Sequence, residues 1–307
     1  MTTALTLKDL PPPPPGKSGW PWTVSSKVIP ETMPDGSELP RLTIVTPSYN
    51  QGKFLEATIR SVLLQGYPNL EYIIIDGGST DCSIEVIKRY EKYLFYWHSK
   101  KDKGQADAIN QGLNKSSGRI LAWINSDDVY VKRTFYKIIK SFQAHPNCVV
   151  VHGNRILINE IGEVTGWVSL PSFDPETGIY NVCSETAFWQ RSAMNEVGLL
   201  NANLQFAIDL EFFSRLYKQG KFLKLDDYLG YFRCYSESKS STIAHIGREE
   251  AVREWKQLFG SENRDGDLTQ RKSFLQFLRL SAELIKQPRL IGLPYLSYRL
   301  LQLNRNS

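Results

Sequence analysis

Short apolar runs alternate with segments of helical spacing along residues 41–151, and this alternation restricts the chain to few folds. The apolar runs predict strands at residues 42–46, 70–75, 93–98, 120–124 and 149–151. The segments between them, such as 54–65, carry apolar residues three and four apart and predict helices. Strands and helices that alternate in this way form right-handed crossovers. The predicted fold class is therefore α/β, with a mainly parallel sheet and helices on both of its faces.

The composition of the 307 residues is that of an ordinary globular protein, with 41% hydrophobic and 22% charged residues. The longest apolar runs reach only about seven residues, well short of the roughly 20 that span a bilayer, so we expect no transmembrane helix. The first ten residues lack the pattern of a secretory signal. Four cysteines without a Cys-x-x-Cys pair argue against a zinc ribbon or a disulfide framework. These features predict a cytoplasmic, reducing location.

Residues 1–40 contain nine of the sixteen prolines, including the run from Pro11 to Pro15. Such a segment favours polyproline II conformation and cannot continue a helix or sheet. On composition a flexible leader is the favoured interpretation. The alternative is a strap that docks on the domain through Trp20 and Trp22, whose rings are costly to leave in water.

The net charge of +5 is concentrated near the end of the chain, where residues 271–307 hold seven basic residues and one acidic residue. The rest of the chain is nearly neutral, so we expect no nucleic-acid partner. Apolar residues in the tail fall on one helical face (Phe274, Phe277, Leu278, Leu284 and Ile285). The favoured interpretation is a helix packed on the catalytic domain. The alternative is an amphipathic segment on an anionic membrane surface, where each Lys or Arg contributes about 1 kcal/mol.

Three polar loops follow the predicted strands, and ligands of such sheets bind beyond the carboxyl ends of the strands. The loops begin after residues 46, 75 and 124. They supply the hydroxyls and ring of Thr46, Pro47, Ser48 and Tyr49, the carboxylate and glycines of Asp76, Gly77, Gly78 and Ser79, and the acidic stretch Asn125, Ser126, Asp127 and Asp128. Their convergence predicts one binding site at this edge of the sheet.

Asp127 and Asp128 are adjacent carboxylates that repel each other unless a cation lies beside them. Oxygen ligands of this kind suit Mg²⁺ or Mn²⁺, which commonly bridge substrate phosphates. A solvated turn or helix cap is the simpler interpretation of two acids alone, but their place after a central strand favours a metal–phosphate site. Asp76 could accept hydrogen bonds from a base or ribose, and Tyr49 could stack on a base or pack on the sheet edge. Asp81 is predicted to cap the following helix.

Asp209 lies in the first turn of a helix predicted from Ile208, Phe212, Phe213 and Leu216. It is either a helix-capping acid or a general base directed into the cleft, and spacing does not decide between them. Residues 185–189 predict a strand that faces the same cleft, which makes Glu185 and Trp189 candidates for binding an acceptor. Histidines with metal-ligand spacing, a Ser-His-Asp arrangement, a Walker loop and a Gly-x-Gly-x-x-Gly turn are all absent from the sequence.

Five motifs in order resemble family 2 glycosyltransferases of the GT-A fold. They are Thr46–Asn50 (Thr-Pro-Ser-Tyr-Asn), Ile74–Asp81 (Ile-Ile-Asp-Gly-Gly-Ser-Thr-Asp), Asn110–Leu113 (Asn-Gln-Gly-Leu), Asn125–Asp128 (Asn-Ser-Asp-Asp) and Ile208–Phe212 (Ile-Asp-Leu-Glu-Phe). The resemblance covers about residues 41–240. It implies a nucleotide-sugar-binding half at 41–154 and an acceptor-binding half at 155–240. The Pro-rich leader at 1–40 and the basic, mostly helical C-terminal extension at 241–307 lie outside it.

The resemblance implies transfer of a sugar from a nucleotide diphosphate to an acceptor hydroxyl with inversion at the anomeric carbon. Asp76 would contact the base, the loop from Thr46 to Tyr49 the nucleoside, and Asp128 with Asp127 the metal on the diphosphate. Asp209 matches the catalytic base. Two departures stand out: Ile109 replaces a common arginine and Tyr235 a common histidine. Nucleotide contacts could then shift to Lys103, Asp107, Arg233 and Lys239.

The prediction is an inverting, Mn²⁺- or Mg²⁺-dependent glycosyltransferase that builds a cell-surface or extracellular glycan from the cytoplasmic side, with peripheral membrane contact through the tail as the open alternative to a packed helix. One alternative is a sugar-1-phosphate nucleotidyltransferase, which would ordinarily carry a Gly-rich, basic loop after the first strand. The other is a catalytically silent subunit that binds a nucleotide sugar or glycan, against which the retained Asp209 and carboxylate pair argue.

Overall fold

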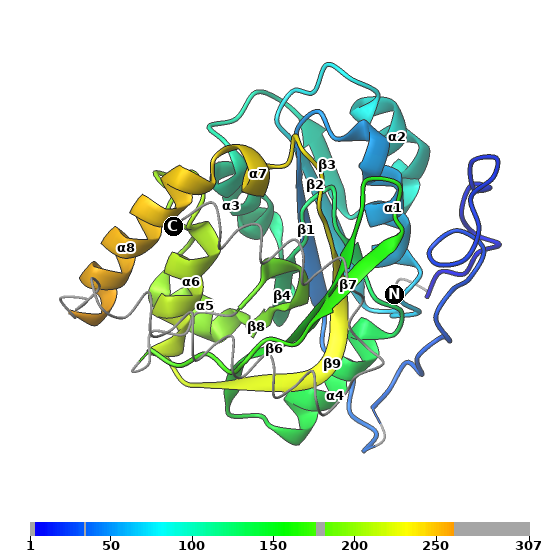
Figure 1. The fold of residues 1–307 in the computed structure, drawn as a ribbon. Coiled ribbons are helices and arrows are strands. Elements are labelled where there is room, and N and C mark those ends of the chain that lie inside the picture. Colours follow the sequence, from blue (N-terminus) through cyan, green and yellow to red (C-terminus); the bar gives the residue numbers. More distant parts are fainter. Residues whose placement is uncertain (1–3, 34, 176–181, 261–307) are drawn as a thin grey trace.

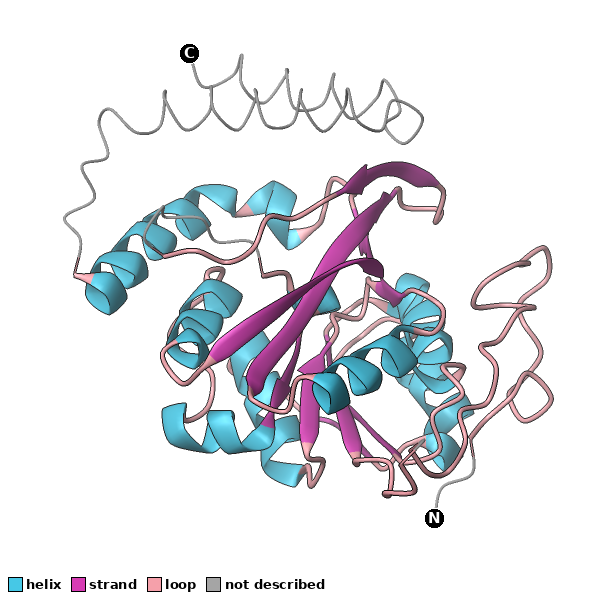
Figure 2. Ribbon diagram, turned by 90° about the horizontal axis from the view of Figure 1, so that it is seen from below, coloured by secondary structure: helices cyan, strands magenta, loops and turns pink. Residues whose placement is uncertain are grey.

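A nine-stranded mixed sheet runs through this computed structural model, which describes residues 4–33, 35–175 and 182–260 (Figure 1). The strand order is β3-β2-β1-β4-β8-β6-β9-β5, and β7 pairs with β6. Helices α1 and α2 lie on one side of the sheet and α3 and α6 on the other, and Figure 2 shows helices flanking the strands from a second direction. The predicted α/β architecture is confirmed.

The first half of the described chain forms the parallel part of the sheet. Its elements are β1 (Leu42–Ser48), α1 (Gly52–Leu63), β2 (Leu70–Asp76), α2 (Ser83–Tyr90), the 3-10 turn η1 (Glu91–Tyr93), β3 (Tyr96–Ser99), α3 (Gln105–Lys115), β4 (Ile120–Trp123), β5 (Val129–Tyr130) and α4 (Thr134–Ala144). Strands β1, β2, β3 and β4 pair in parallel, and Ser48 lies opposite Asp76 at the carboxyl end of the first pair. Every residue of β1 is buried, as expected for a central strand covered by helices on both faces.

The second half adds long antiparallel and parallel pairings that curl around the site. Its elements are β6 (Cys148–Ile158), β7 (Val164–Val168), η2 (Ser184–Thr186), β8 (Phe188–Gln190), α5 (Arg191–Val197), α6 (Ile208–Tyr217), β9 (Lys221–Arg233), α7 (Lys239–Thr242) and α8 (Ala244–Phe259). The strand predicted at 185–189 is only partly correct. Its first residues form the turn η2, because the Thr186 N–H donates to the Cys183 carbonyl at 2.9 Å.

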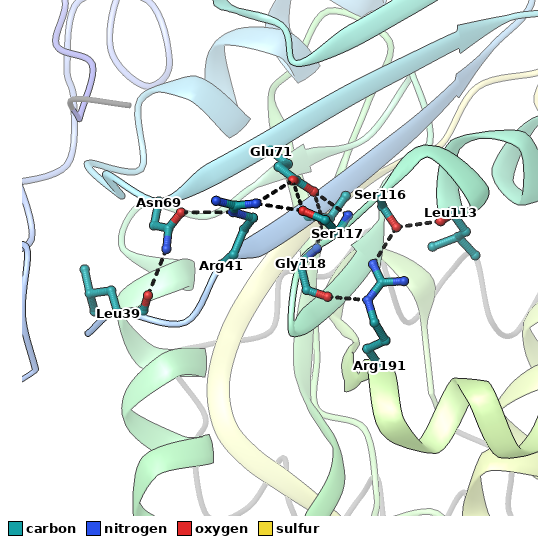
Figure 3. A network of polar contacts seen from close by, with 10 residues as sticks. Leu39, Arg41, Asn69, Glu71, Leu113, Ser116, Ser117, Gly118 and Arg191 are labelled. Atoms are coloured by element: carbon teal, nitrogen blue, oxygen red, sulfur yellow. Dashed lines mark hydrogen bonds and ion pairs between the residues drawn. The ribbon is translucent and has the colours of Figure 1, made fainter. Parts of the chain in front are cut away.

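The amino-terminal edge of the parallel strands is closed by a polar network around the buried carboxylate of Glu71 (Figure 3). The Thr43 hydroxyl donates to Glu71 Oε2 at 2.7 Å, and the Ser117 N–H donates to the same oxygen at 2.8 Å. Burial alone would raise the pKa of Glu71, but these hydrogen bonds and the charge of Arg41 outweigh it and lower the pKa. Bound in this way, Glu71 ties β1, β2 and the approach to β4 together at the edge opposite the polar loops.

The Pro-rich segment packs against the domain, so the favoured expectation of a flexible leader is wrong for its described residues. The buried Arg60 of α1 donates to the carbonyl oxygens of Pro11 at 2.8 Å, Pro21 at 3.1 Å and Trp22 at 2.9 Å. Trp20 Nε1 donates to the Tyr130 carbonyl at 2.8 Å. The segment has no regular structure, and the buried guanidinium of Arg60 holds it by donating to its carbonyl oxygens. The structure therefore shows the alternative interpretation, a strap docked on the domain.

The tail predicted to form a basic amphipathic helix at 274–285 lies outside the described residues. Within them, no helix is both long and apolar enough to cross a membrane. Helix α8, which begins the C-terminal extension, packs beside α6 (Figure 1).

Candidate active site

A cavity of about 1000 Å³ opens at the carboxyl ends of β1, β2 and β4. One side is formed by the predicted strand-end loops, including Tyr49, Gly77 and Asp127. The other side comes from the second half of the chain, where Glu185 and Asp209 line the same cavity. The convergence of the three loops, and their meeting with the later half of the chain, is therefore present in the fold.

The two adjacent acids separate into one cavity residue and one interior residue. Asp127 is half-buried and lines the cavity, and its Oδ2 accepts a hydrogen bond from the Tyr235 hydroxyl at 2.8 Å. Asp128 is 1% exposed and does not line the cavity; its Oδ1 accepts the Arg233 N–H at 3.0 Å. Burial raises the pKa of both carboxyls, and for Asp128 the neighbouring charges of Asp127 and Glu185 raise it further. Of the two, Asp127 is the acid that a ligand in the cavity can reach.

Asp209 lies in the first turn of α6, and that turn faces the cavity. Burial raises its pKa to about 6, against the opposing hydrogen bond that its Oδ1 accepts from the Leu210 N–H at 2.8 Å. The charge of Glu185 adds to the increase, and Arg155 opposes it. A carboxyl with a pKa close to neutral pH is suited to accept a proton from a hydroxyl group. Asp209 thus lies in the first helical turn and also faces the cleft, whereas the N-cap position itself is held by Ala207.

The buried Glu185 and the half-buried Arg155 form an ion pair near Asp209. Arg155 Nη1 lies 3.5 Å from Glu185 Oε1, and its guanidinium stacks over the Phe232 ring at 4.5 Å. Burial raises the pKa of Glu185, and Arg155 opposes that shift. The Nε of Arg155 is buried without a hydrogen-bond partner among the described residues. Sequence reasoning missed Arg155, although a single arginine within the apolar strand β6 was a usable signal.

Some of the residues predicted to bind the donor line the cavity, and others are buried outside its lining. Pro47, Ser48 and the 62%-exposed Tyr49 line the cavity. Thr46 does not, because its side chain is buried and its hydroxyl lies 3.1 Å from the Tyr72 hydroxyl. Asp76 is also fully buried and lies outside the lining. Direct contact of Thr46 and Asp76 with a nucleotide is therefore not supported by this geometry.

The buried carboxylate of Asp76 shapes the loop that follows β2. It accepts hydrogen bonds from the backbone N–H groups of Gly78 at 3.1 Å and Ser79 at 2.9 Å, and from the Ser99 hydroxyl at 2.7 Å. Asp81 likewise receives the N–H groups of Ser83 at 2.9 Å and Gly52 at 2.8 Å. The expectation that Asp81 caps the following helix is confirmed, and it links the starts of α1 and α2 as well.

Lys103 and Asp107 were expected near the nucleotide, and neither lines the cavity. The Asp107 carboxylate instead accepts the Lys103 N–H at 3.1 Å at the start of α3. The turn that they stabilise presents Asp102 and Gln105 to the cavity, two residues that sequence reasoning missed. The polar run before a predicted helix was the available signal.

Two of the residues considered as substitute contacts, Arg233 and Lys239, do line the cavity, as does Tyr235, which stands where relatives commonly carry a histidine. Lys239 Nζ donates to Gln105 Oε1 at 2.6 Å, and Gln105 Nε2 donates to Asn125 Oδ1 at 2.7 Å. This chain of contacts joins the segment after β9 to α3 and to the acidic loop. The guanidinium of Arg233 is already occupied, since its Nε donates to the Asp127 carbonyl at 2.8 Å.

The prediction that Trp189 contacts an acceptor is wrong. Its ring is fully buried in the core, where it packs against Trp123 at 5.4 Å and Phe212 at 5.3 Å. Strand β8 alternates its side chains, so residues that are adjacent in the predicted strand cannot all face the cleft. Glu185 reaches the cavity because it belongs to the preceding turn η2.

The side chains on the cavity wall that could bind a metal are mainly carboxylates, led by that of Asp127, and two cysteines, Cys183 and Cys234, line the wall as well. Within the parts of the chain that the structure describes, no cluster of three His, Cys, Asp or Glu residues could by itself enclose a metal ion. Mg²⁺ and related ions are commonly held by one or two carboxylates together with substrate phosphates. The residues present therefore fit an ion that binds with a phosphorylated substrate.

Residues 43–197 match the family described as Glycosyl transferase family 2, and this segment is half of the chain. The chain belongs to glycosyltransferase family 2. TuaG of Bacillus subtilis, named for teichuronic acid biosynthesis, is 34% identical over 112 residues, which cover 36% of this chain and 44% of TuaG. GlyA of Streptococcus pneumoniae, named a glycosyltransferase, is 32% identical over 126 residues, covering 39% of this chain and 17% of GlyA. The matched segments thus span less than half the length of these curated relatives.

Solved structures confirm the GT-A fold of this family 2 chain. TarS residues 1–349 of S. aureus, in complex with UDP-GlcNAc, align with a TM-score of 0.58 at 17% identity over 71% of this chain and 65% of TarS. The mannosyltransferase PcManGT of Pyrobaculum calidifontis, in complex with GDP-Man and Mn²⁺, aligns with a TM-score of 0.56 at 16% identity over 89% of this chain and 82% of PcManGT. At this level of identity the likeness establishes the fold alone.

Proposed function

We propose that this protein transfers a sugar from a nucleotide diphosphate to an acceptor hydroxyl with inversion, and that Asp209 is the general base. The observation that carries the proposal is the cavity position of Asp209, whose pKa is raised to about 6, across from the loop that bears Asp127. Family membership supports the reaction class, and the donors in the titles of the two solved structures support a nucleotide sugar.

The proposed reaction is a single displacement. The ionised Asp209 carboxylate takes the proton of the acceptor hydroxyl as its oxygen forms a bond to the anomeric carbon. The bond from that carbon to the diphosphate oxygen breaks on the opposite side, and the electron pair leaves with the diphosphate. Because one displacement inverts the centre, no enzyme nucleophile is required. Burial raises the pKa of Asp209 to about 6. The carboxylate is then basic enough to accept the proton and is still mostly ionised at neutral pH.

Asp127 is the proposed contact for Mn²⁺ or Mg²⁺ on the diphosphate, and such an ion would neutralise charge on the leaving group. Tyr235 orients the Asp127 carboxylate through its 2.8 Å hydrogen bond. Lys239 supplies a further positive charge on the same wall. Tyr49, Ser48 and Asp102 surround the part of the cavity that we assign to the nucleoside. Glu185 and Arg155, beside Asp209, belong to the proposed acceptor side.

A cell-surface or extracellular polysaccharide is the proposed product, since TuaG is named for teichuronic acid biosynthesis. We propose that the protein works on the cytoplasmic side of the membrane, with its basic C-terminal segment as the peripheral contact. The charge of that segment in the sequence supports this assignment.

The test is to incubate the protein with Mn²⁺, a panel of nucleotide sugars and glycan acceptors, and to measure released nucleoside diphosphate. Asp209→Asn is expected to lower kcat at least about 100-fold, because it removes the general base. Asp226→Asn is the matched control, since the Asp226 side chain is 99% exposed on β9. In the wild-type protein kcat should decrease as the pH falls through about 6, where Asp209 becomes protonated. Unchanged turnover in Asp209→Asn, or release of pyrophosphate instead, contradicts the proposal.

A further inference from the structure

Helix α8 lies outside the segment that matches the family, yet one of its side chains holds the backbone that leads to Asp209. Glu250 is only 6% exposed. Its Oε1 accepts the Gln205 N–H at 2.8 Å, and its Oε2 accepts the Phe206 N–H at 2.8 Å and the Ala207 N–H at 2.9 Å. These three residues immediately precede α6, and Asp209 is the second residue of that helix.

The contact supplies what the sequence before α6 lacks. Helix termini leave backbone N–H groups without partners, and a side chain at the N-cap position usually accepts them. The N-cap residue here is Ala207, which has no side-chain acceptor. The buried carboxylate of Glu250, from a different helix, accepts the N–H of this N-cap residue and those of the two residues before it, and an anion at this end also suits the helix dipole.

Two further contacts align α8 with α6. Gly247 lies against the ring of Phe206, and a Cβ atom at position 247 would come within 2.2 Å of that ring. At the far end, Lys218 Nζ donates to the Leu258 carbonyl at 2.6 Å. Phe206 itself lines the cavity. Helix α8 is thus fastened near both ends of α6, and its Gly247 lies against Phe206 of the cavity wall.

We propose that Glu250 is a positioning residue for the catalytic base, so that α8 is an integral part of the active site. This inference rests on the proposed role of Asp209. Glu250 fixes residues 205–207, which lead directly into the first turn of α6, by its three N–H contacts, and Gly247 sets the position of Phe206. The charged groups that face Asp209 from the surrounding elements are Glu185 on η2, Arg155 on β6 and Lys239 on α7.

The experiment compares Glu250→Ala and Glu250→Gln with the wild-type protein, and uses Glu249→Gln, a change of the exposed neighbouring acid, as the control. In Glu250→Ala, kcat should fall by about 10- to 100-fold, since small misplacements of a reacting group are costly. KM for the donor should stay within about twofold, because the strand-end loops are untouched. Glu250→Gln keeps one acceptor oxygen, so its loss of kcat should be smaller. Glu249→Gln should match the wild-type protein.

The pH profile separates positioning from a general loss of stability. When the first turn of α6 loosens in Glu250→Ala, Asp209 becomes better hydrated and its pKa should fall toward the usual value of a carboxyl. The decrease of kcat at acidic pH should therefore occur at a lower pH than in the wild-type protein. A change that only unfolds part of the molecules lowers the active fraction and leaves the pH of this decrease unchanged. That result, or a wild-type kcat in folded Glu250→Ala, overturns the proposal.

Amide hydrogen exchange gives a readout that needs no activity. The amides of residues 205–207, which donate to Glu250, should exchange faster in Glu250→Ala and at the wild-type rate in Glu249→Gln. If Glu250→Ala does not fold, Gly247→Ala decides, because it displaces Phe206 and should lower kcat with little change in donor KM. Unchanged kcat in Gly247→Ala would then count against the proposal. Failure of the proposed function would appear in two measurements that do not involve Glu250: the activity of the wild-type protein and the activity of Asp209→Asn.

Discussion

At the scale of single residues, neighbours in the sequence have different surroundings. Asp127 faces the cavity, whereas Asp128 lies in the interior with the Arg233 N–H as its partner. Their carboxylates have the same chemistry, but only the first can exchange a protein hydrogen bond for a ligand. The sequence assigned the metal to both, with Asp128 as the main ligand, and the geometry favours Asp127.

Asp127→Asn is expected to raise the Mn²⁺ concentration for half-maximal activity by about tenfold or more, because it removes the charge that faces the diphosphate. Asp128→Asn keeps an acceptor oxygen for the Arg233 N–H and removes a buried like charge, so its Mn²⁺ response should stay within about twofold of wild type. Titrations of nucleoside diphosphate release against Mn²⁺ measure both. The reverse order of the two effects would return the metal role to Asp128.

At the scale of elements, helix α1 joins the cavity edge to the Pro-rich strap. Gln51, just before α1, lines the cavity, and Arg60 near its other end binds the strap carbonyls. Arg60 Nη1 also donates to the Tyr90 hydroxyl at 3.0 Å, which connects α2 to the same group. The strap is thus part of the packing around α1, although composition alone favours a free leader.

Arg60→Met should lower the free energy of unfolding by about 2–4 kcal/mol, because it leaves three buried or partly buried carbonyl oxygens without their donors. Arg89→Met is the matched control. Arg89 is about half exposed and pairs with Glu56 at 2.9 Å, so its loss should cost less than about 1 kcal/mol. Urea denaturation measures the free energies, and limited proteolysis should cut residues 4–33 faster in Arg60→Met. Equal stability of the two variants would show that the strap contributes little.

At the scale of the whole molecule, acid stability should depend on the buried His152 of β6. Both ring nitrogens lack hydrogen-bond partners among the described residues, and burial, together with the charge of Lys224, lowers its pKa to about 4. The unfolded chain binds a proton near pH 6.5, well before the folded chain does. The neutral ring therefore contributes its full stability above pH 6.5, and this is lost as the pH falls toward 4.

The His152→Phe variant should remove this component of the acid dependence. The wild-type protein is expected to lose about 3 kcal/mol more than the variant between pH 7.5 and pH 4. Other carboxyls titrate in the same range, so the comparison is the difference between the two proteins in urea denaturation at each pH. Parallel pH curves would show that His152 finds a partner when protonated.

The sequence by itself determined the strands, helices and polar loops of the parallel half, because hydrophobic periodicity is a local property and the burial of β1, β2 and β4 follows from it. It also determined that three loops would meet at one edge, since parallel strands end on the same side. It brought Asp209 to the site only through the resemblance, since spacing left helix capping and catalysis equal.

Only the tertiary structure decided which side chains reach the cavity. Trp189 and Thr46 lie inside, Arg155 and Gln105 reach the wall, and Glu250 contacts the backbone before Asp209 from a helix more than 40 residues away. The physical reason is that the direction of a side chain, and whether it is buried, depend on which other elements pack against its helix or strand. Turn η2 packs against β6 and β9, and α6 packs against α8. These contacts join residues distant in the sequence, which local periodicity does not record.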